Sequence, residues 1–375
     1  MENKYLLSNV DFSVVSEQSF NEISKKNVDL DIIPMQIIWC FYFWLIFTTL
    51  YFSHGRWIKN AEKNSLSHKS SWTFDNGIQW CDQVLNYKNI DSYIGITQVS
   101  ACFNCLRNFE IETTFYVLSE YTMSHAMKNK NAVVKALALN GKNSLSKWIE
   151  REIQVYQSAK RIMVPSEYIK NELNNYYSIK SSSVSVIGYG ANFNFVSFSG
   201  RTLETKSKYQ ILFVGKRFEQ KGGDVILKSL DILNKNGLFV ELVIVGPRVN
   251  PCLCRSDVKF LGRIYERQAL FYIYQKSDVF VIHSCYEAEA FGLVFLEAMA
   301  NGTPCIASDI DVMPDILAME RGFVVPLQDF MMLAQNVRQL LAEDDLYEKM
   351  SKNGVVAVQE YYNWPAVVEG FLAEL

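Results

Sequence analysis

Residues 283–308 read HSCYEAEAFGLVFLEAMANGTPCIAS. One apolar run, residues 279–282, comes directly before this stretch, a second, residues 305–307, lies near its end, and each is typical of a buried strand. Residues 291–300 have the composition of a helix, and Asn301-Gly302 after them is a helix stop signal. The sequence therefore predicts a strand, a loop, a helix, a turn and a second strand.

The junction between this loop and this helix is suited to bind a polar ligand. Gly292 has no side chain, so a ligand can approach the backbone closely. The N–H groups of Phe291, Gly292 and Leu293 are expected to point out of the helix N-terminus, toward a phosphate or a polar sugar. Glu289 and Glu297 lie eight positions apart, which places them near the same side of a helix, and each carboxylate can accept hydrogen bonds from a hydroxyl.

A second pattern, GKRFEQKGGD at residues 215–224, follows another apolar run. Gly215 permits a tight turn after a strand, and Lys216 and Lys221 flank the loop that opens the next helix. A leaving diphosphate needs positive charge where its own charge develops, and basic side chains supply it when no metal is bound. Arg217 is a neighbouring cation that can take the same part.

The two patterns together resemble the donor site of retaining GT-B glycosyltransferases of family 4, the group 1 type. That family carries Glu, seven residues, Glu, with Phe-Gly after the first Glu, and residues 289–304 match it through the closing Glu-Ala-Met-Ala-x-Gly-x-Pro. Residues 215–222 resemble the family's Gly-(Arg/Lys)-x4-Lys-Gly. The family's usual Pro-Ser is His283-Ser284 here, and the long gap that follows leaves Glu287 as a second candidate for the first glutamate.

The resemblance implies a role for each matched residue. Lys216 and Lys221 would stabilise the departing diphosphate, and Glu289 would hold hydroxyls of the transferred sugar; these three are the implied catalytic residues. Glu297 would hold the ribose hydroxyls, and a loop after another strand would read the nucleotide base through its backbone. The implied donor-binding residues are Gly215, Arg217, Arg263, Ile264, Phe291, Gly292, Leu293 and Glu297.

The resemblance also implies the reaction and its partners. A sugar would pass from a UDP- or GDP-linked donor to a hydroxyl of a glycan, polysaccharide or lipid-linked acceptor, with retention of anomeric configuration. No metal or other cofactor is expected, because no Asp-x-Asp motif lies in a suitable place. Two alternatives stay open: a non-catalytic transferase-like subunit that binds a nucleotide sugar or a partner chain, and a sugar phosphorylase.

The implied fold is GT-B, an α/β fold of two Rossmann-like domains that face each other across a cleft. The expected domains are an acceptor-side domain over residues 1–200, a nucleotide-sugar domain over 208–355, and a segment over 356–375 whose helix crosses back to the first domain. In the second domain apolar strands alternate with helical segments, which indicates a doubly wound parallel sheet with its ligands at the carboxyl ends of the strands. The strands expected there are 211–214, 240–245, 258–261, 279–282, 305–307 and 323–325.

The N-terminal half resembles the family more weakly, and the Gly-rich loop after the family's first strand is missing. Strands are expected at 91–99, 115–119, 161–164 and 184–187, and helices at 148–160 and from residue 167, with Ser166 as the cap of the second helix. Glu120 and His125 follow the 115–119 strand and are candidates for the acceptor side, although structural roles explain them equally well.

The first 55 residues raise the question of a membrane. Residues 1–31 are polar, without clear periodicity or a secretory signal. Residues 32–55 carry no charge and exceed the roughly 20 residues that span a bilayer, but their polar positions and scattered aromatics equally fit a buried helix or a membrane-surface helix. Basic residues follow, so the bulk of the chain is expected in the cytoplasm, with or without contact to the cytoplasmic face of a membrane.

Composition restricts the function classes further. A length of 375 residues with 49% hydrophobic and 21% charged side chains suits two globular domains, and the net charge of −3 gives no indication of nucleic-acid binding. The eight cysteines include two close pairs, but no histidine lies beside either pair to complete a zinc site. Free buried thiols are therefore expected.

Overall fold

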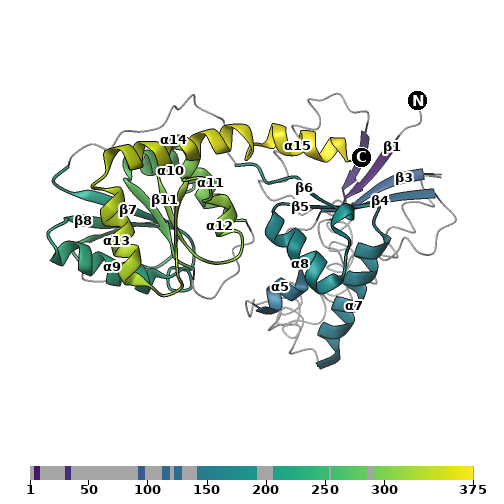
Figure 1. The fold of residues 1–375 in the computed structure, drawn as a ribbon, viewed down its shortest axis with the longest axis horizontal. Coiled ribbons are helices and arrows are strands. Elements are labelled where there is room, and N and C mark those ends of the chain that lie inside the picture. Colours follow the sequence, from purple (N-terminus) through teal and green to yellow (C-terminus); the bar gives the residue numbers. More distant parts are fainter. Residues whose placement is uncertain are drawn as a thin grey trace, which may run out of the picture. The chain divides into compact units, whose positions relative to one another are not determined.

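The computed structural model describes residues 4–8, 30–34, 92–97, 112–118, 122–128, 142–191, 206–252, 255–284 and 291–374. The chain divides into two compact units (Figure 1). Unit 1 comprises Met1–Ile187 and Val368–Leu375, and unit 2 comprises Gly188–Val367. Each unit contains one parallel sheet, as expected for the GT-B fold class.

The sheet of unit 1 has the strand order β2-β1-β3-β4-β5-β6, with every neighbouring pair parallel. Its strands are β1 (Lys4–Ser8), β2 (Leu30–Pro34), β3 (Ser92–Thr97), β4 (Glu112–Leu118), β5 (Arg161–Val164) and β6 (Val184–Val186). The described helices are α5 (Met123–Lys128), α7 (Lys142–Ser158), α8 (Glu167–Tyr177) and the 3-10 turn η3 (Ser181–Ser183).

The start of the chain differs from the sequence-based expectation. Lys4–Ser8 pairs with both β2 and β3, so a polar region without clear periodicity supplies an interior strand of the sheet. Residues 32–34, the beginning of the uncharged stretch, belong to β2 and not to a helix. Residues 35–55 lie outside the described residues, so the alternatives for them remain predictions. Within the described part of the chain, no helix has the length and apolar character that crossing a bilayer requires.

Helix α8 forms where the sequence predicts it. Ser166 is its N-cap, and the Ser166 hydroxyl accepts a hydrogen bond from the Ile169 N–H at 3.3 Å. The helix ends at Tyr177, whose hydroxyl donates to a carboxylate oxygen of Glu152 on α7 at 2.5 Å and accepts from the Ser124 N–H on α5 at 3.0 Å. Burial and the neighbouring carboxylate raise the pKa of Tyr177, so this hydroxyl stays protonated and ties the three helices together.

The sheet of unit 2 has the strand order β12-β11-β10-β7-β8-β9, again entirely parallel. Its strands are β7 (Tyr209–Val214), β8 (Val240–Val245), β9 (Val258–Gly262), β10 (Val279–Ile282), β11 (Cys305–Ser308) and β12 (Gly322–Val325). Its helices are α9 (Gly223–Lys235), α10 (Arg267–Lys276), α11 (Leu293–Ala300), α12 (Met313–Ile316), α13 (Phe330–Leu340) and α14 (Asp344–Glu360). All six expected strands are confirmed to within two residues at either end.

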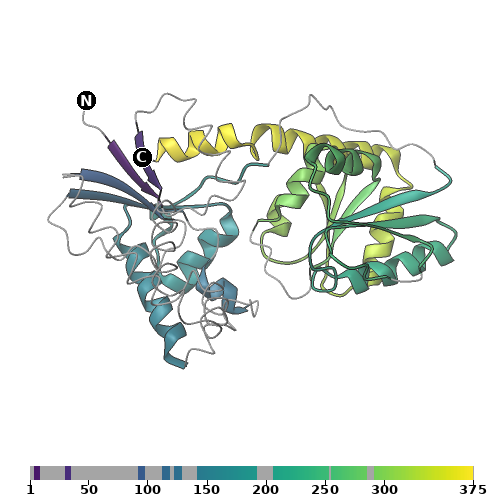
Figure 2. The ribbon, with the colours of Figure 1, turned by 180° about the vertical axis from the view of Figure 1, so that it is seen from behind.

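Helices cover both faces of the unit 2 sheet (Figures 1 and 2). The chain runs from β7 through α9 to β8 in one direction, and from β9 through α10 to β10 in the other, so right-handed crossovers place α9 and α10 on opposite faces. Helix α13 packs beside α9, and α14 packs against α11. This double covering explains why every residue of β10 and β11 is buried and why their sequences are continuous apolar runs.

The last helix, α15 (Trp364–Ala373), passes the division between the units. Its residues up to Val367 belong to unit 2, and residues from Val368 onward belong to unit 1, where the guanidinium of Arg161 lies 2.8 Å from the carboxylate of Glu374. Within the segment expected over residues 356–375, α14 extends to Glu360 and α15 forms the final helix.

Candidate active site

The described donor-site candidates gather at the carboxyl ends of the unit 2 strands. Gly215 follows β7, Arg263 and Ile264 follow β9, and His283 follows β10. These strands are neighbours within the order β10-β7-β8-β9, so the loops that follow them lie together at the carboxyl ends of the strands. Residues far apart in the sequence are thereby brought into one region.

Backbone contacts join the loops after β7, β8 and β9. Gly246 after β8 has φ +115°, and a Cβ there would lie 2.6 Å from the carbonyl oxygen of Gly215. The Gly215 N–H donates to the carbonyl of Val245 at 2.9 Å, and the Gly246 N–H donates to the carbonyl of Gly262 at 2.7 Å. The three loops therefore pack main chain to main chain at the carboxyl end of the sheet.

Gly222 connects the two sequence motifs. It is the N-cap of α9 with φ +75°, and a Cβ at this position would overlap the carbonyl group of His283. The His283 N–H donates to the carbonyl of Lys221 at 3.2 Å. The Lys221–Gly222 turn of the first motif thus lies directly against the first residue of the second motif.

The side chain of Lys221 lies across Gly215. A Cβ on Gly215 would be 2.8 Å from the Cδ atom of Lys221, so the glycine leaves room for the aliphatic part of the lysine. Lys216 and Arg217, on the same loop, are exposed, and Lys221 is partly exposed. The loop after β7 therefore presents three positive charges from one short segment.

Helix α11 begins later than the sequence indicates. Gly292 is its N-cap with φ +71°, Leu293 is its first residue, and the Phe295 N–H donates to the Gly292 carbonyl at 2.8 Å. The expectation that the Phe291 N–H belongs to the helix N-terminus is therefore wrong; Leu293 and Val294 supply the N–H groups of the first turn. The reason is the positive φ of Gly292, which turns the chain one residue before the helix starts.

Phe291 has a packing role instead. Its side chain is 6% exposed, and its ring lies between those of Tyr189, with centroids 5.3 Å apart, and Tyr362, at 5.9 Å. Behind it, a Cβ on Gly292 would lie 2.5 Å from the terminal methyl group of Met313. Aromatic packing thus fixes the start of α11 against the rest of unit 2.

Glu297 lies in the second turn of α11 and is partly buried. Its Oε2 atom accepts a hydrogen bond from the hydroxyl of Tyr274 on α10 at 3.0 Å. Burial raises the pKa of Glu297, whereas the bond from Tyr274 and the positive charge of Arg267 act in the opposite direction. The carboxylate is thus anchored on its inner side.

Three candidates cannot be placed. Glu287 and Glu289 lie in residues 285–290, and Glu120 precedes α5, all outside the described residues. His125 in unit 1 is fully buried, and its Nδ1 atom lies 3.0 Å from the hydroxyl of Tyr168. A buried imidazole in such a contact favours the structural interpretation of His125 over contact with an acceptor.

His283 has a structural role that the sequence did not predict. Its side chain is fully buried, and its Nε2 atom accepts a hydrogen bond from the backbone N–H of Gln328 at 2.9 Å, where Gln328 has φ +62°. Because Nε2 is the acceptor, the proton of the neutral ring sits on Nδ1. Burial lowers the pKa of His283, and the negative charges of Asp224 and Asp329 partly oppose this. The one sequence signal was its departure from the family's usual proline.

The cysteine prediction is confirmed where it can be tested: Cys252 and Cys305 are free and buried. Within the described ranges no group of three or more His, Cys, Asp or Glu side chains is arranged to hold a metal ion.

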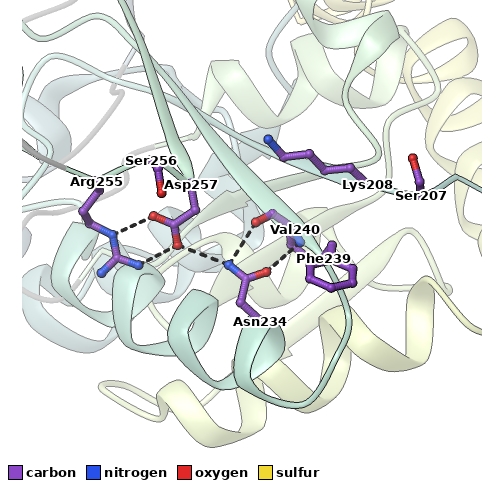
Figure 3. Close-up of a pocket in the computed structure, with 8 residues that line it drawn as sticks. All are labelled: Ser207, Lys208, Asn234, Phe239, Val240, Arg255, Ser256 and Asp257. Carbon is purple, nitrogen blue, oxygen red and sulfur yellow. Dashed lines mark hydrogen bonds and ion pairs between the residues drawn. The ribbon is translucent and has the colours of Figure 1, made fainter.

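A depression lies at the opposite end of the unit 2 strands, near the amino ends of β7, β8 and β9 (Figure 3). Three of its polar side chains bond to one another: the Arg255 guanidinium donates to the Asp257 carboxylate at 2.8 Å, and Asn234 donates to the same carboxylate at 3.2 Å. These bonds fix the turn before β9. The depression is lined by Ser207, Lys208, Asn234, Phe239, Val240, Arg255, Ser256 and Asp257.

Replacing Gly222 by Ala should destabilise the protein by more than replacing Gly237 by Ala. Both glycines have positive φ, but a Cβ at Gly237 meets nothing within 4 Å, whereas one at Gly222 overlaps the His283 carbonyl. Gly237→Ala should cost about 1–2 kcal/mol from backbone strain alone. Urea unfolding of both variants measures the difference, and equal losses would show that the Gly222–His283 contact adds no constraint.

His283→Gln should weaken the dependence of stability on pH. The folded imidazole has a lower pKa than the unfolded one, so the unfolded state binds more protons near pH 6 and stability falls as pH drops through the ordinary histidine range. Glutamine keeps an acceptor for the Gln328 N–H but does not titrate. Urea unfolding at pH 8 and pH 5 should show a smaller loss for the variant; the same loss in both proteins would contradict the buried neutral imidazole.

Comparison with known proteins shows which family residues in the C-terminal half of the chain resemble. Residues 197–355 match the sequence profile of the family described as glycosyl transferases group 1. A capsular polysaccharide biosynthesis glycosyltransferase, CapM, of Staphylococcus aureus is 25% identical over 54% of this chain and 57% of its own length. A phosphatidyl-myo-inositol mannosyltransferase of Mycobacterium leprae is 34% identical over 42% of this chain and 43% of its own. The chain spans about half the length of these curated relatives.

Solved structures resemble the whole chain. A glycosyltransferase of Rickettsia africae superposes with a TM-score of 0.65 at 16% identity, over 100% of this chain and 98% of its own. A sucrose-phosphate synthase of Thermosynechococcus elongatus superposes with a TM-score of 0.64 at 16% identity, over 99% and 98%. These likenesses establish the fold. The chain therefore has the GT-B fold, and its residues 197–355 are similar to the group 1 glycosyl transferases.

Proposed function

We propose that this protein transfers a sugar from a nucleoside-diphosphate sugar to a hydroxyl acceptor with retention of anomeric configuration. The observation that carries the proposal is the contact between Gly222 and His283. It brings the basic loop after β7 against the start of the loop that leads to α11. The carboxyl end of the sheet thereby combines positive charge, a helix N-terminus and a carboxylate on α11. This combination suits a ligand with a diphosphate and two sugar rings.

The basic loop would bind the diphosphate. Lys216, Arg217 and Lys221 supply positive charge, and the first-turn N–H groups of α11 at Leu293 and Val294 have no partner one turn earlier in the helix. Charge develops on the phosphate oxygen as the bond to the sugar breaks, so fixed positive groups stabilise the transition state more than the bound donor. This charge set would make a divalent metal unnecessary, and we propose metal-independent transfer without a cofactor.

The carboxylates would hold hydroxyl groups. Glu297 would accept hydrogen bonds from the ribose, and Glu289 from the transferred sugar, while the backbone near Arg263 and Ile264 would contact the base of a UDP- or GDP-linked donor. In the transfer step a bond forms between the acceptor oxygen and the anomeric carbon on the face that the nucleotide leaves. The bond from that carbon to the phosphate oxygen breaks, and the acceptor proton passes to the leaving oxygen.

The proposed class of acceptor is based on the names of the relatives. One is named for capsular polysaccharide biosynthesis and another for mannosyl transfer to phosphatidyl-myo-inositol. These names support a polysaccharide, glycan or lipid-linked acceptor for this chain as well. Such acceptors are consistent with work at the cytoplasmic face of a membrane, and the net charge of −3 gives no support for a nucleic-acid partner.

Thermal unfolding with UDP, GDP and ADP tests the donor site. One nucleotide at a hundred times its Kd should stabilise the protein by about 2.7 kcal/mol, with or without magnesium. Lys221→Ala should abolish this shift, whereas Lys235→Ala, at the last residue of the helix α9 that follows Lys221, should keep it. A shift that requires magnesium would contradict metal independence, and no shift with any nucleotide would favour the sugar phosphorylase or a subunit that binds only a partner chain.

Activity separates an enzyme from a non-catalytic nucleotide-binding subunit. With the donor identified by the thermal shifts, Lys221→Ala should lower turnover about 100- to 1,000-fold, the usual effect of removing a group that stabilises a developing oxyanion. Release of the nucleoside diphosphate measures the rate, and Lys235→Ala serves as the charge-matched control. Unchanged turnover in Lys221→Ala would remove this lysine from the catalytic site.

A further inference from the structure

Tyr274 touches Glu297 from inside the domain. It lies on α10, its side chain is fully buried, and its hydroxyl donates to Oε2 of Glu297 on α11 at 3.0 Å. Its ring packs near that of Phe280, with centroids 5.7 Å apart, and its backbone carbonyl accepts a hydrogen bond from the Thr303 hydroxyl at 2.7 Å. The tyrosine is therefore held in place at both its backbone and its ring, independently of Glu297.

Glu297 differs from Tyr274 in its exposure. Its carboxylate lies on a helix that starts at the candidate site, and the residue is partly exposed. Since Tyr274 has no exposed surface, it contacts Glu297 from the buried side of the residue. The backbone carbonyl of Glu297 also accepts a hydrogen bond from the Asn301 side chain at 3.0 Å, which stabilises the end of the same helix.

We propose that Tyr274 is a positioning residue for nucleotide binding: its hydroxyl fixes one oxygen of Glu297, so that the other oxygen is presented to the ribose hydroxyls. This inference rests on the proposed function. A glutamate side chain loses rotamer freedom when it is ordered, and without a partner Glu297 would lose that freedom on binding the ligand. The buried hydroxyl imposes that order before the nucleotide arrives, so the ligand meets a carboxylate already oriented.

Charge supports the same arrangement. Tyr274 can donate to Glu297 only while its own hydroxyl stays protonated, and burial, followed by the negative charge of Glu297, raises the pKa of Tyr274 well above its ordinary value. The bond in turn opposes the effect of burial on the pKa of Glu297. The proton thus stays on the tyrosine hydroxyl, and the carboxylate remains an acceptor for hydroxyl groups.

Removing the tyrosine hydroxyl alone tests the proposal. Calorimetric titration of wild-type protein and Tyr274→Phe with UDP, GDP and ADP, and with the 2′,3′-dideoxy form of each, measures the Kd values. For the nucleotide that binds, Tyr274→Phe should raise Kd about tenfold, the usual effect of losing a hydrogen bond to a charged group. The dideoxy form should bind both proteins equally, because it lacks the hydroxyls that Glu297 would hold.

Two further variants provide the controls. Tyr347→Phe removes the hydroxyl of another fully buried tyrosine in the same unit, on α14, and should leave Kd unchanged. Glu297→Gln should weaken binding of the nucleotide, and adding Tyr274→Phe to it should weaken binding no further, because the two residues act as one unit. A melting temperature for each variant establishes that it is folded.

The possible failures are distinguishable. If Glu297→Gln weakens binding but Tyr274→Phe does not, the positioning role is wrong and the proposed function stands. If Tyr274→Phe weakens binding of the nucleotide and of its dideoxy form equally, the hydroxyl supports the fold and not the ribose contact, which also overturns the inference. If the wild-type protein binds no nucleotide, the proposed function fails, and the inference fails with it.

Discussion

The candidate site depends on one backbone contact, that of Gly222 against His283. Strands β7 and β10 are neighbours in the sheet, but adjacency alone does not bring the loops that follow them together. The loop after β7 can reach the loop after β10 only because residue 222 has no side chain and tolerates φ +75°. A hydrogen bond from the His283 N–H to the Lys221 carbonyl then holds the two loops. This contact therefore fixes the position of the Lys221 backbone beside the first residue after β10.

Buried polar groups complete the site from behind. His283 accepts from Gln328, Tyr274 donates to Glu297, and each bond offsets the cost of removing a polar group from water. A buried group with a satisfied partner has few alternative positions, so these bonds fix the loops more firmly than apolar packing alone. The basic side chains of the loop after β7 are thus exposed or partly exposed, while Tyr274 and His283 are buried beneath the site.

The sequence predicted the parts of the fold that depend on local patterns. Strands β8 and β10 were placed at their observed bounds, because continuous apolar runs between turn signals leave few alternatives. Strand β1 was missed, since five residues in a polar region give no period, and its pairing with β2 and β3 is a long-range contact.

The site was predictable to the same extent. Gly215, Lys221 and Gly292 carried motif signals, whereas the bond between Tyr274 and Glu297 joins two helices whose relative position follows from packing. No spacing in the sequence could have shown it.

The proposed function requires this site to cleave a nucleoside-diphosphate sugar and to retain the anomeric configuration. Proton NMR of the purified protein with a UDP- or GDP-linked α-sugar, in the absence of added metal, tests it without knowledge of the acceptor, because water can accept the sugar slowly. The account predicts release of the nucleoside diphosphate, with the α-anomer of the free sugar appearing first and mutarotation following. First appearance of the β-anomer, or no cleavage of any such donor, would contradict it.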